Sequence, residues 1–286
     1  MYMHVNGQIV NEGEAHISPF DHGFLYGLGV FETFRIYDGH PFLLDDHINR
    51  INNSLKELHI LYVCSRHEIE KILQELLYEN GLRDARIRLN ISAGAAPVGL
   101  QTSPYQRPNI LLFMQQMIVP QGLQEKKGIL LKTRRNKPET SERLKSHHYL
   151  NNMIAKREIT ANPDSEGIFL NEDGYLAEGI ASNLFWVKDH TLYTPAIQTG
   201  ILNGVTRQFV LKLAKKSGFV IQEGLYKIED IGTADEVFCT NSIQEIFSVG
   251  EIKGIGSFQG RSGTGTSFLF EAYQTYRTLL YSRNEI

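Results

Sequence analysis

The sequence contains little cysteine, a single tryptophan and no marked excess of charge of either sign. Its two cysteines, Cys64 and Cys239, are too few for a disulfide framework or a four-thiolate zinc site. We therefore expect the chain to work in a reducing cytoplasm. The formal net charge of −3 argues against nucleic acid as a partner, because nucleic-acid-binding proteins carry a basic patch.

Long hydrophobic runs are also missing. No apolar stretch approaches the roughly 20 residues that a membrane helix needs. The first residues, MYMHVNGQIV, lack the basic region and the apolar stretch of a signal peptide. Hydrophobic residues make up 42% of the 286 residues and charged residues 21%, which is an ordinary globular balance. We expect a cytoplasmic protein with a normal core and no membrane segment.

Short strands and amphipathic helices alternate along the whole chain. Asn6-Gly7 and Asp38-Gly39 are strong hairpin signals between apolar runs. The spacing of Ile48, Ile51 and Leu55 predicts a helix after Asp45, because apolar residues three and four apart share one helical face. Further helices are predicted at residues 66–81, 206–217 and 267–283. This mixture predicts an α+β fold rather than a doubly wound parallel sheet.

A break in the pattern divides the chain. VPQGLQEKKG, at residues 119–128, combines proline, glycine and charge. We therefore predict an N-terminal α+β domain at residues 1–119, an interdomain linker at 120–127, and a C-terminal domain at 128–286.

One crowded stretch, RLKSHHYLNNMIAKRE, contains the best candidate for a reactive amine. Lys145 is flanked by cations and by apolar residues, and such surroundings lower the pKa of an amine and make it nucleophilic. An ordinary exposed lysine is the alternative, since most lysines lie at the surface. Adjacent residues such as His147 and His148 point apart on a helix or strand, and cysteine partners are lacking, so we expect no metal site.

Two other segments suggest an anion site and a buried acid. TGILNGVTRQF runs from a glycine-rich turn into a helix beginning near Thr206, and backbone N–H groups at such a terminus bind phosphate. A capped helix without a ligand is the alternative. Glu178 lies among apolar strand residues in LAEGIASNLFWV, so it needs a partner, either a structural one or a protonated ring nitrogen. Arg50 is either solvated or a phosphate ligand.

The order of these segments is more specific than any one of them. DHGFLYGLGVFETFR, DDHINR, RLKSHHYLNN, LAEGIASNLFW, GILNGVTR and TNSIQEI follow one another as in the class IV (fold type IV) pyridoxal-phosphate enzymes, which the chain resembles from about Val5 to Ser267. The longer matches, through SPFDHGFLYGLGVFETFR and RLKSHHYLNNMIAKRE, are most similar to bacterial aminodeoxychorismate lyases. The resemblance implies the two-domain architecture of D-amino-acid aminotransferase, with the cofactor at the domain interface.

The resemblance also implies a role for each matching residue. Lys145 would bind pyridoxal 5'-phosphate covalently and move protons, and Glu178 would pair with the pyridinium nitrogen. Tyr149 would lie near the phenolic oxygen of the cofactor. The phosphate would be held by four residues of the matching segments, Arg50, Val205, Thr206 and Ser242.

The chain departs from one branch of the family at the substrate site. D-amino-acid aminotransferases have a tyrosine and an arginine where this sequence has Phe31 and Ala93, so their carboxylate-binding set is missing here. Thr33 is expected to face the site and to assist proton transfer. The substrate carboxylates would then be bound by other residues, for which the candidates are His147, His148, Arg88 and Arg107.

The resemblance favours a lyase that converts 4-amino-4-deoxychorismate to 4-aminobenzoate and pyruvate for folate synthesis. An aminotransferase acting on branched-chain or D-amino acids is the alternative, with the same lysine and cofactor but a keto-acid acceptor. A non-catalytic binding module on an α+β scaffold is the third hypothesis, and the specific set of site residues argues against it. The family also implies a homodimer that acts on a small molecule.

Overall fold

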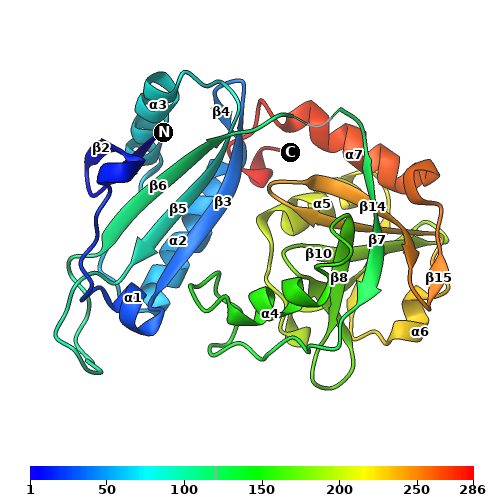
Figure 1. Ribbon diagram of the computed structural model, residues 1–286. Helices are drawn as coiled ribbons and strands as arrows, with labels where there is room; N and C mark the ends of the chain where they lie inside the picture. Colours follow the sequence, from blue (N-terminus) through cyan, green and yellow to red (C-terminus); the bar gives the residue numbers. More distant parts are fainter. Residues whose placement is uncertain (120) are drawn as a thin grey trace. The chain divides into compact units, whose positions relative to one another are not determined.

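The computed structural model describes residues 1–119 and 121–286, and its contacts divide the chain into two compact units (Figure 1). Helices alternate with mostly antiparallel strands in both of them, as predicted for an α+β fold. Among the described residues, the first unit comprises Met1–Val119, Leu144–His148 and Arg277–Glu285, and the second comprises 121–143, Tyr149–Tyr276 and Ile286.

The first unit is built on a six-stranded antiparallel sheet with the order β2-β1-β6-β5-β3-β4. Asn6 and Asp38 have positive φ angles, as type I′ hairpin turns require, and they connect the two predicted hairpins. The strands are β1 (Tyr2–Val5), β2 (Gln8–Asn11), β3 (Gly29–Tyr37), β4 (His40–Pro41), β5 (Ala85–Ser92) and β6 (Asn109–Gln116).

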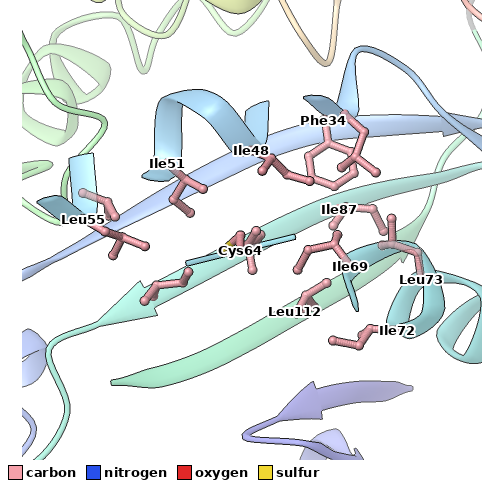
Figure 2. Close-up of a cluster of buried hydrophobic side chains, with 14 of the residues drawn as sticks. Phe34, Ile48, Ile51, Leu55, Cys64, Ile69, Ile72, Leu73, Ile87 and Leu112 are labelled. Atoms are coloured by element: carbon pink, nitrogen blue, oxygen red, sulfur yellow. The ribbon is translucent and has the colours of Figure 1, made fainter. Parts of the chain in front are cut away.

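Two amphipathic helices, α2 (Leu44–Glu57) and α3 (Arg66–Asn80), bury their apolar stripes against this sheet (Figure 2). Burial of each large aliphatic side chain contributes about 1.5–3 kcal/mol to folding. A third helix, α1 (His22–Tyr26), is short and ends at Gly27 in the left-handed region. The side chains in Figure 2 come from the two helices, from the strands and from the connection between the helices, and include Phe34, Ile48, Ile51, Leu55, Cys64, Ile69, Ile72, Leu73, Ile87 and Leu112.

Strand periodicity assigns the residues of β3 to two faces. Phe34 points into the core, so Phe31 and Thr33 lie on the opposite face. The register pairs Phe31 with Asn90 and Thr33 with Arg88, and directly paired residues share a face. The face of the sheet away from the core therefore presents polar and cationic side chains.

The second unit contains a nine-stranded sheet that closes on itself. The path β12-β11-β10-β13-β14-β7-β8-β9 returns through an additional pairing of β9 with β10, at Glu178 and Asn183. Six strands from β10 to β9 thus form a ring. The strands are β7 (Gln124–Leu130), β8 (Ser165–Leu170), β9 (Leu176–Gly179), β10 (Asn183–Lys188), β11 (Thr191–Pro195), β12 (Val220–Gly224), β13 (Glu236–Asn241), β14 (Glu245–Ile252) and β15 (Gly256–Ser257).

The helices of the second unit are α4 (Leu150–Glu158), α5 (Val205–Lys216), α6 (Ile228–Ile231) and α7 (Thr264–Tyr276). Helix α5 agrees with the helix predicted at 206–217. Within the described ranges, every helix is too short or too polar to span a lipid bilayer. Four 3₁₀ turns complete the elements, at Glu12–Glu14, Ile197–Thr199, Gly260–Ser262 and Arg283–Glu285.

Two predicted boundaries differ from the structure. Residue 120, where the predicted linker begins, lies outside the described residues, and residues 124–127 belong to β7 instead, which pairs with β14 and β8. The polar composition that indicated a linker reflects a partly exposed strand. The helix predicted at 267–283 ends at Tyr276, because the carbonyls of Leu280 and Tyr281 accept hydrogen bonds from Leu43 and Asp45 of the first unit.

Candidate active site

The segment Leu144–His148 of the first unit extends the sheet at the edge of β3. The Phe31 N–H donates to the Lys145 carbonyl at 2.9 Å, and the His147 N–H donates to the Gly29 carbonyl at 2.9 Å. Val30 and Ser146 form the antiparallel bridge between these bonds. The candidate lysine is therefore attached by its backbone to an ordered strand, which is more rigid than a free loop.

Two cations contact the ring of Phe31. The Lys145 Nζ atom lies 4.5 Å from the ring centroid and the Arg88 Cζ atom lies 3.7 Å from it. Phe31 is only 3% exposed, so these cation–π contacts form on a ring that is shielded from water. The Arg88 guanidinium also donates to Asn90 Oδ1 at 3.2 Å. The arrangement holds the amine of Lys145 beside a second positive charge.

The two adjacent histidines point to different partners. His147 Nε2 lies 3.1 Å from Asn90 Oδ1, whereas His148 Nε2 lies 3.3 Å from the Tyr26 carbonyl. Burial, together with the nearby charge of Arg88, lowers the pKa of His147 to about 4. His147 is therefore neutral near pH 7. With its Nε2 protonated it donates to Asn90 and adds no charge of its own.

Glycines make room for both imidazoles. A Cβ atom on Gly29 would lie 2.3 Å from His147 Cε1, and one on Gly27 would lie 2.7 Å from His148 Cδ2. Real Cβ atoms do not approach other atoms so closely, so a side chain at either position would displace an imidazole. Gly27 and Gly29 are therefore explained by the packing of the two imidazoles.

A cavity of about 600 Å³ opens on the same face of the sheet. Its polar wall includes Arg86, Arg88 and Asn90. The one acid in the wall, Asp21, already accepts hydrogen bonds from Ser92, Asn109 and the Gly23 N–H, all at 2.5 Å. The cavity therefore has a cationic wall suited to an anion. Its remaining lining is mostly apolar: Ile17, Gly23, Phe24, Ser92, Leu111, Phe113, Gln115 and His147.

Arg50 is fixed by a buried acid that the sequence did not identify. Its Nε and Nη2 atoms donate to the two carboxylate oxygens of Glu32 at 2.6 and 2.7 Å. His47 Nδ1 contacts the same carboxylate at 2.6 Å. Burial alone would raise the pKa of Glu32, but Arg50 and His47 outweigh it and lower that pKa to about 2. Arg50 thus projects from α2 in one orientation, and its side chain is 17% exposed.

Glu178 lies in the second unit, at the strand pair that closes the sheet, and is 4% exposed. One carboxylate oxygen accepts from Arg135 Nε at 2.8 Å. The other accepts from the Leu202 N–H at 3.0 Å and from Asn183 Nδ2 at 3.4 Å. Arg143 Nε lies 4.0 Å away. One carboxylate oxygen is therefore held by a charged group, and the other is held by a backbone N–H and a side-chain amide.

Arg135 is the second functional residue that sequence reasoning missed. It is 5% exposed, and besides Glu178 it donates to Asn151 Oδ1 at 2.8 Å and to Asn152 Oδ1 at 3.1 Å. These asparagines belong to the crowded stretch that drew attention to Lys145. The polar run there is thus explained in part by support for the acid.

The N-cap residue of helix α5 is Gly204, which has no side chain to cap the helix. Thr206 Oγ1 and Ser242 Oγ lie 3.1 Å apart in the first turn of this helix and in the turn between β13 and β14. A Cβ atom on Gly204 would lie 2.1 Å from Asn183 Oδ1, so the backbone passes close to β10. Two hydroxyls beside Val205 and a helix N-terminus form a donor set that suits phosphate.

The predicted site residues fall into two sets. The structure places Phe31, Thr33, Arg50, Lys145, His147 and His148 in the first unit, and Tyr149, Glu178, Val205, Thr206 and Ser242 in the second. Tyr149 directly precedes α4, and Thr33 is half-buried on the cationic face of the sheet. The candidate Arg107 is exposed and does not line the cavity, whereas Arg88 does. No group of three metal-ligating side chains gathers among the described residues.

Each unit by itself carries groups that suit a phosphorylated cofactor that reacts with an amine. The first unit has a positioned lysine and an arginine, and the second has a buried carboxylate and a hydroxyl-lined helix N-terminus. The carboxylate would meet a protonated ring nitrogen, and the hydroxyls would donate to phosphate. Pyridoxal phosphate has a group that reacts with an amine, a ring nitrogen that can be protonated, and a phosphate.

Comparison with known proteins identifies the class. The family model described as amino-transferase class IV matches residues 29–252, and the chain belongs to this family. The curated relatives include the aminodeoxychorismate lyase of Bacillus subtilis, 51% identical over 275 residues that span 95% of this chain and 93% of the relative. They also include a putative branched-chain-amino-acid aminotransferase of Methanocaldococcus jannaschii, 37% identical over 97% of each chain.

Solved structures agree with this assignment. The branched-chain amino acid aminotransferase from Escherichia coli superposes with a TM-score of 0.85. It is 29% identical in sequence, and the match covers 97% of this chain and 94% of that one. The predicted fold type IV architecture is confirmed.

Proposed function

We propose that this protein is an aminodeoxychorismate lyase that uses pyridoxal 5'-phosphate. It would release pyruvate from 4-amino-4-deoxychorismate and leave 4-aminobenzoate, a precursor for folate. The observation that carries the proposal is the 51% identity to a lyase of that name, which extends over 95% of the chain. The positioned amine of Lys145 and the donor sets of the two units are consistent with the cofactor.

The cofactor, when bound, supplies an electron sink that stabilises negative charge on the substrate carbon. Lys145 would hold it through its amine. Glu178 would keep the ring nitrogen protonated, which strengthens the sink, and Tyr149 would meet the phenolic oxygen. The phosphate would be bound by Arg50, by the N–H groups and hydroxyl of Val205 and Thr206, and by Ser242.

The amine of Lys145 also moves the proton. Lys145 Nζ would remove the ring proton from the substrate carbon that bears nitrogen. The C–H electron pair would form the new ring double bond as the C–O bond to the enolpyruvyl group breaks, so that the ring becomes aromatic. The enolate that leaves would take up a proton at its methylene carbon to give pyruvate. Thr33 assists in proton transfer. The atoms balance without an oxidant or a second substrate.

The substrate carries two carboxylates, and the cavity of the first unit has the matching charge. Arg88 is the first choice for binding one of them, because it lines the cavity and touches the ring that also contacts Lys145. His147 lines the same cavity and donates to Asn90, which orients the polar wall. His148 follows His147 in sequence and is exposed. The ring of Phe31 contacts both Arg88 and Lys145.

An aminotransferase is the second candidate, because the 37% identical relative bears that name. The two activities differ in their need for an acceptor. Purified protein loaded with pyridoxal phosphate should release fluorescent 4-aminobenzoate from aminodeoxychorismate over many turnovers without any keto acid. Silence in this assay, together with turnover of a branched-chain or D-amino acid with 2-oxoglutarate, would replace the lyase by the aminotransferase.

Substitution of the amine is the sharpest test of the site. Lys145→Ala should abolish the yellow colour of the complex with pyridoxal phosphate and reduce turnover by at least about 10⁴-fold. Lys253→Ala, at an exposed lysine of the second unit, is the matched control and should leave both unchanged. Appreciable turnover of Lys145→Ala in the lyase assay contradicts the assignment.

The protein is further expected to act as a homodimer in the cytoplasm. Exposed apolar side chains support an assembly: Phe20, Phe24 and Leu100 are 55%, 71% and 94% exposed. Both cysteines are buried free thiols, as expected in a reducing compartment. Light scattering on the purified chain would show twice the mass of 32.5 kDa.

A further inference from the structure

The C-terminal segment, Arg277–Glu285, belongs to the first unit and lies against the N-terminal turn of α2. We propose that this segment is a positioning element for Arg50, and that it raises the affinity for the phosphate of the cofactor. The inference rests on the proposed function, since it takes Arg50 as a phosphate ligand. Arg283 and Asp46 carry the effect without touching the cofactor themselves.

The first turn of α2 has no cap of its own. Its N-cap residue, Leu43, has a φ of 55° and offers no side-chain oxygen. The C-terminal segment supplies the missing acceptors instead. The Leu280 carbonyl accepts the Leu43 N–H at 3.0 Å, and the Tyr281 carbonyl accepts the Asp45 N–H at 2.9 Å. Unsatisfied N–H groups at a helix terminus are costly, so this turn depends on the segment.

An ion pair strengthens the same contact. Asp46 is 4% exposed, and its carboxylate accepts from the Arg283 N–H at 2.7 Å and from the Arg283 guanidinium. A buried acid requires such a partner. Arg283 is the natural point to intervene, because its side chain is 29% exposed and can be shortened without opening the core.

Aromatic contacts keep the segment in register with the helix. The rings of Tyr281 and His40 meet edge to face at 4.6 Å, and the Arg66 guanidinium lies 4.4 Å from the Tyr281 ring centroid. Arg66 also pairs with Asp45 at 3.0 Å. His40 Nε2 lies 3.0 Å from the Leu280 carbonyl. The segment therefore contacts His40, which precedes α2 in sequence, and Arg66, which follows it.

The first turn of α2 leads in sequence to Arg50, the proposed phosphate ligand. Asp46 precedes His47 in sequence and lies four residues, about one helical turn, before Arg50. His47 and Arg50 share the carboxylate of Glu32, so a shift of the first turn moves one of the two groups that fix Arg50. Loosening the C-terminal segment should therefore alter the orientation of Arg50, whereas Lys145 is attached to β3 and does not depend on the first turn of α2.

Comparison of two aldehydes isolates this effect. Pyridoxal phosphate and pyridoxal react with Lys145 through the same group, but only the first has a phosphate. Apoprotein of the unmodified chain, of Arg283→Met and of Arg83→Met would be titrated with each compound by absorbance, well below the melting temperature of every apoprotein. Arg83 is a matched control, since its pair with Asp38 lies in the same unit at an exposed turn, with the side chains 78% and 63% exposed.

Arg283→Met should weaken pyridoxal phosphate about 5- to 20-fold and change pyridoxal by less than about twofold, a coupling within the usual range for sites linked through structure. Arg83→Met should change neither. Asp46→Asn should act like Arg283→Met, and the double variant should add little to either one, because both remove the same contact.

Equal weakening of both aldehydes, or no weakening of either, would overturn the positioning role and leave a purely structural contact. Failure of the proposed function looks different. In that case the unmodified protein would fail to prefer pyridoxal phosphate to pyridoxal, or would bind it as well without the Lys145 amine, and the inference would fall with it.

Discussion

In the first unit a buried acid holds a cation, whereas in the second two buried cations hold an acid. Glu32 binds Arg50 through contacts of 2.6 and 2.7 Å. Arg135 binds Glu178 at 2.8 Å, with Arg143 at 4.0 Å. In each case a buried partner of opposite charge holds the group that is proposed to meet the cofactor. Buried charges are seldom retained for stability alone, because their desolvation offsets the attraction.

The surroundings of the two ion pairs also differ. The side chains that bind the Glu32 carboxylate, Arg50 and His47, both belong to α2, so the orientation of that carboxylate depends on this helix. Glu178 receives contacts from an arginine, an asparagine and the Leu202 N–H, and lies at the closing pair of a sheet. The arrangement in the second unit is therefore the more rigid one, and disruption of the two pairs should have different consequences.

Removal of the acid in the second unit should have the largest effect. Glu178→Ala leaves Arg135 and Arg143 buried without their acid, which should cost about 3–5 kcal/mol in the free energy of unfolding. Turnover should fall about 10²–10³-fold, as expected for loss of a buried charge at the reacting group. Urea unfolding and the lyase assay measure the two effects. Glu251→Gln, which removes an exposed pair with Lys127, should change either by little.

Removal of the acid in the first unit should affect binding more than chemistry. Glu32→Gln keeps a hydrogen-bond acceptor but leaves the Arg50 guanidinium free to turn. We expect the dissociation constant for pyridoxal phosphate to rise about 10- to 100-fold, which corresponds to the loss of one charge-assisted pair. Turnover at saturating cofactor should fall by less than in Glu178→Ala. An equal loss in both variants would remove the distinction between the two units.

The ion pair of Glu32 should also affect how the free energy of unfolding depends on pH. The pKa of Glu32 is depressed from 4.5 to about 2, so its ion pair adds stability that is complete above pH 4.5. This contribution is lost as the pH falls from about 4.5 towards 2. Urea unfolding across that window should show a steeper fall for the unmodified protein than for Glu32→Gln. Parallel curves would mean that Glu32 is not paired in solution.

The smallest of these effects concerns the substrate. Arg88→Gln removes one cation from the cavity and from the Phe31 ring while keeping a donor for Asn90. KM for aminodeoxychorismate should rise about 10-fold with little change in kcat, because a substrate carboxylate would lose one charged contact. Arg107→Gln is the matched control, since it removes an exposed arginine outside the cavity. Equal effects of the two substitutions would contradict the assignment of Arg88.

Local patterns in the sequence predicted the elements well and the charge partners poorly. Hairpin turns indicated strands of the first unit, apolar residues indicated the strand around Glu178, and helical spacing indicated α2. Arg135 and Glu32 were missed because their partners lie 43 and 18 residues away, and nothing in a single sequence pairs positions at such distances. The end of α7 was missed for a similar reason. The apolar pattern continues beyond Tyr276, but the carbonyls of Leu280 and Tyr281 accept hydrogen bonds from Leu43 and Asp45.

The resemblance contributed what spacing alone did not. The residues around Lys145 made it a candidate for a reactive amine but left an ordinary exposed lysine as the alternative, and the ordered series of motifs favoured the reactive amine. The structure adds a physical reason for its neighbours: His147 is half-buried and neutral near pH 7, Asn90 aligns it, and Gly29 leaves room for its ring. These contacts depend on strand register, which becomes visible only once β3, β5 and the lysine segment are paired.

The single pair Asn183–Glu178 closes the sheet of the second unit and also presents the acid. A molecule in which this seam is open, for example during synthesis or on warming, has an incomplete acid site. A ligand that binds only the closed form shifts the population towards it by mass action. Cofactor supply would therefore influence how much of the newly made chain survives proteolysis, and cells short of vitamin B6 should contain less of this protein as well as less active protein.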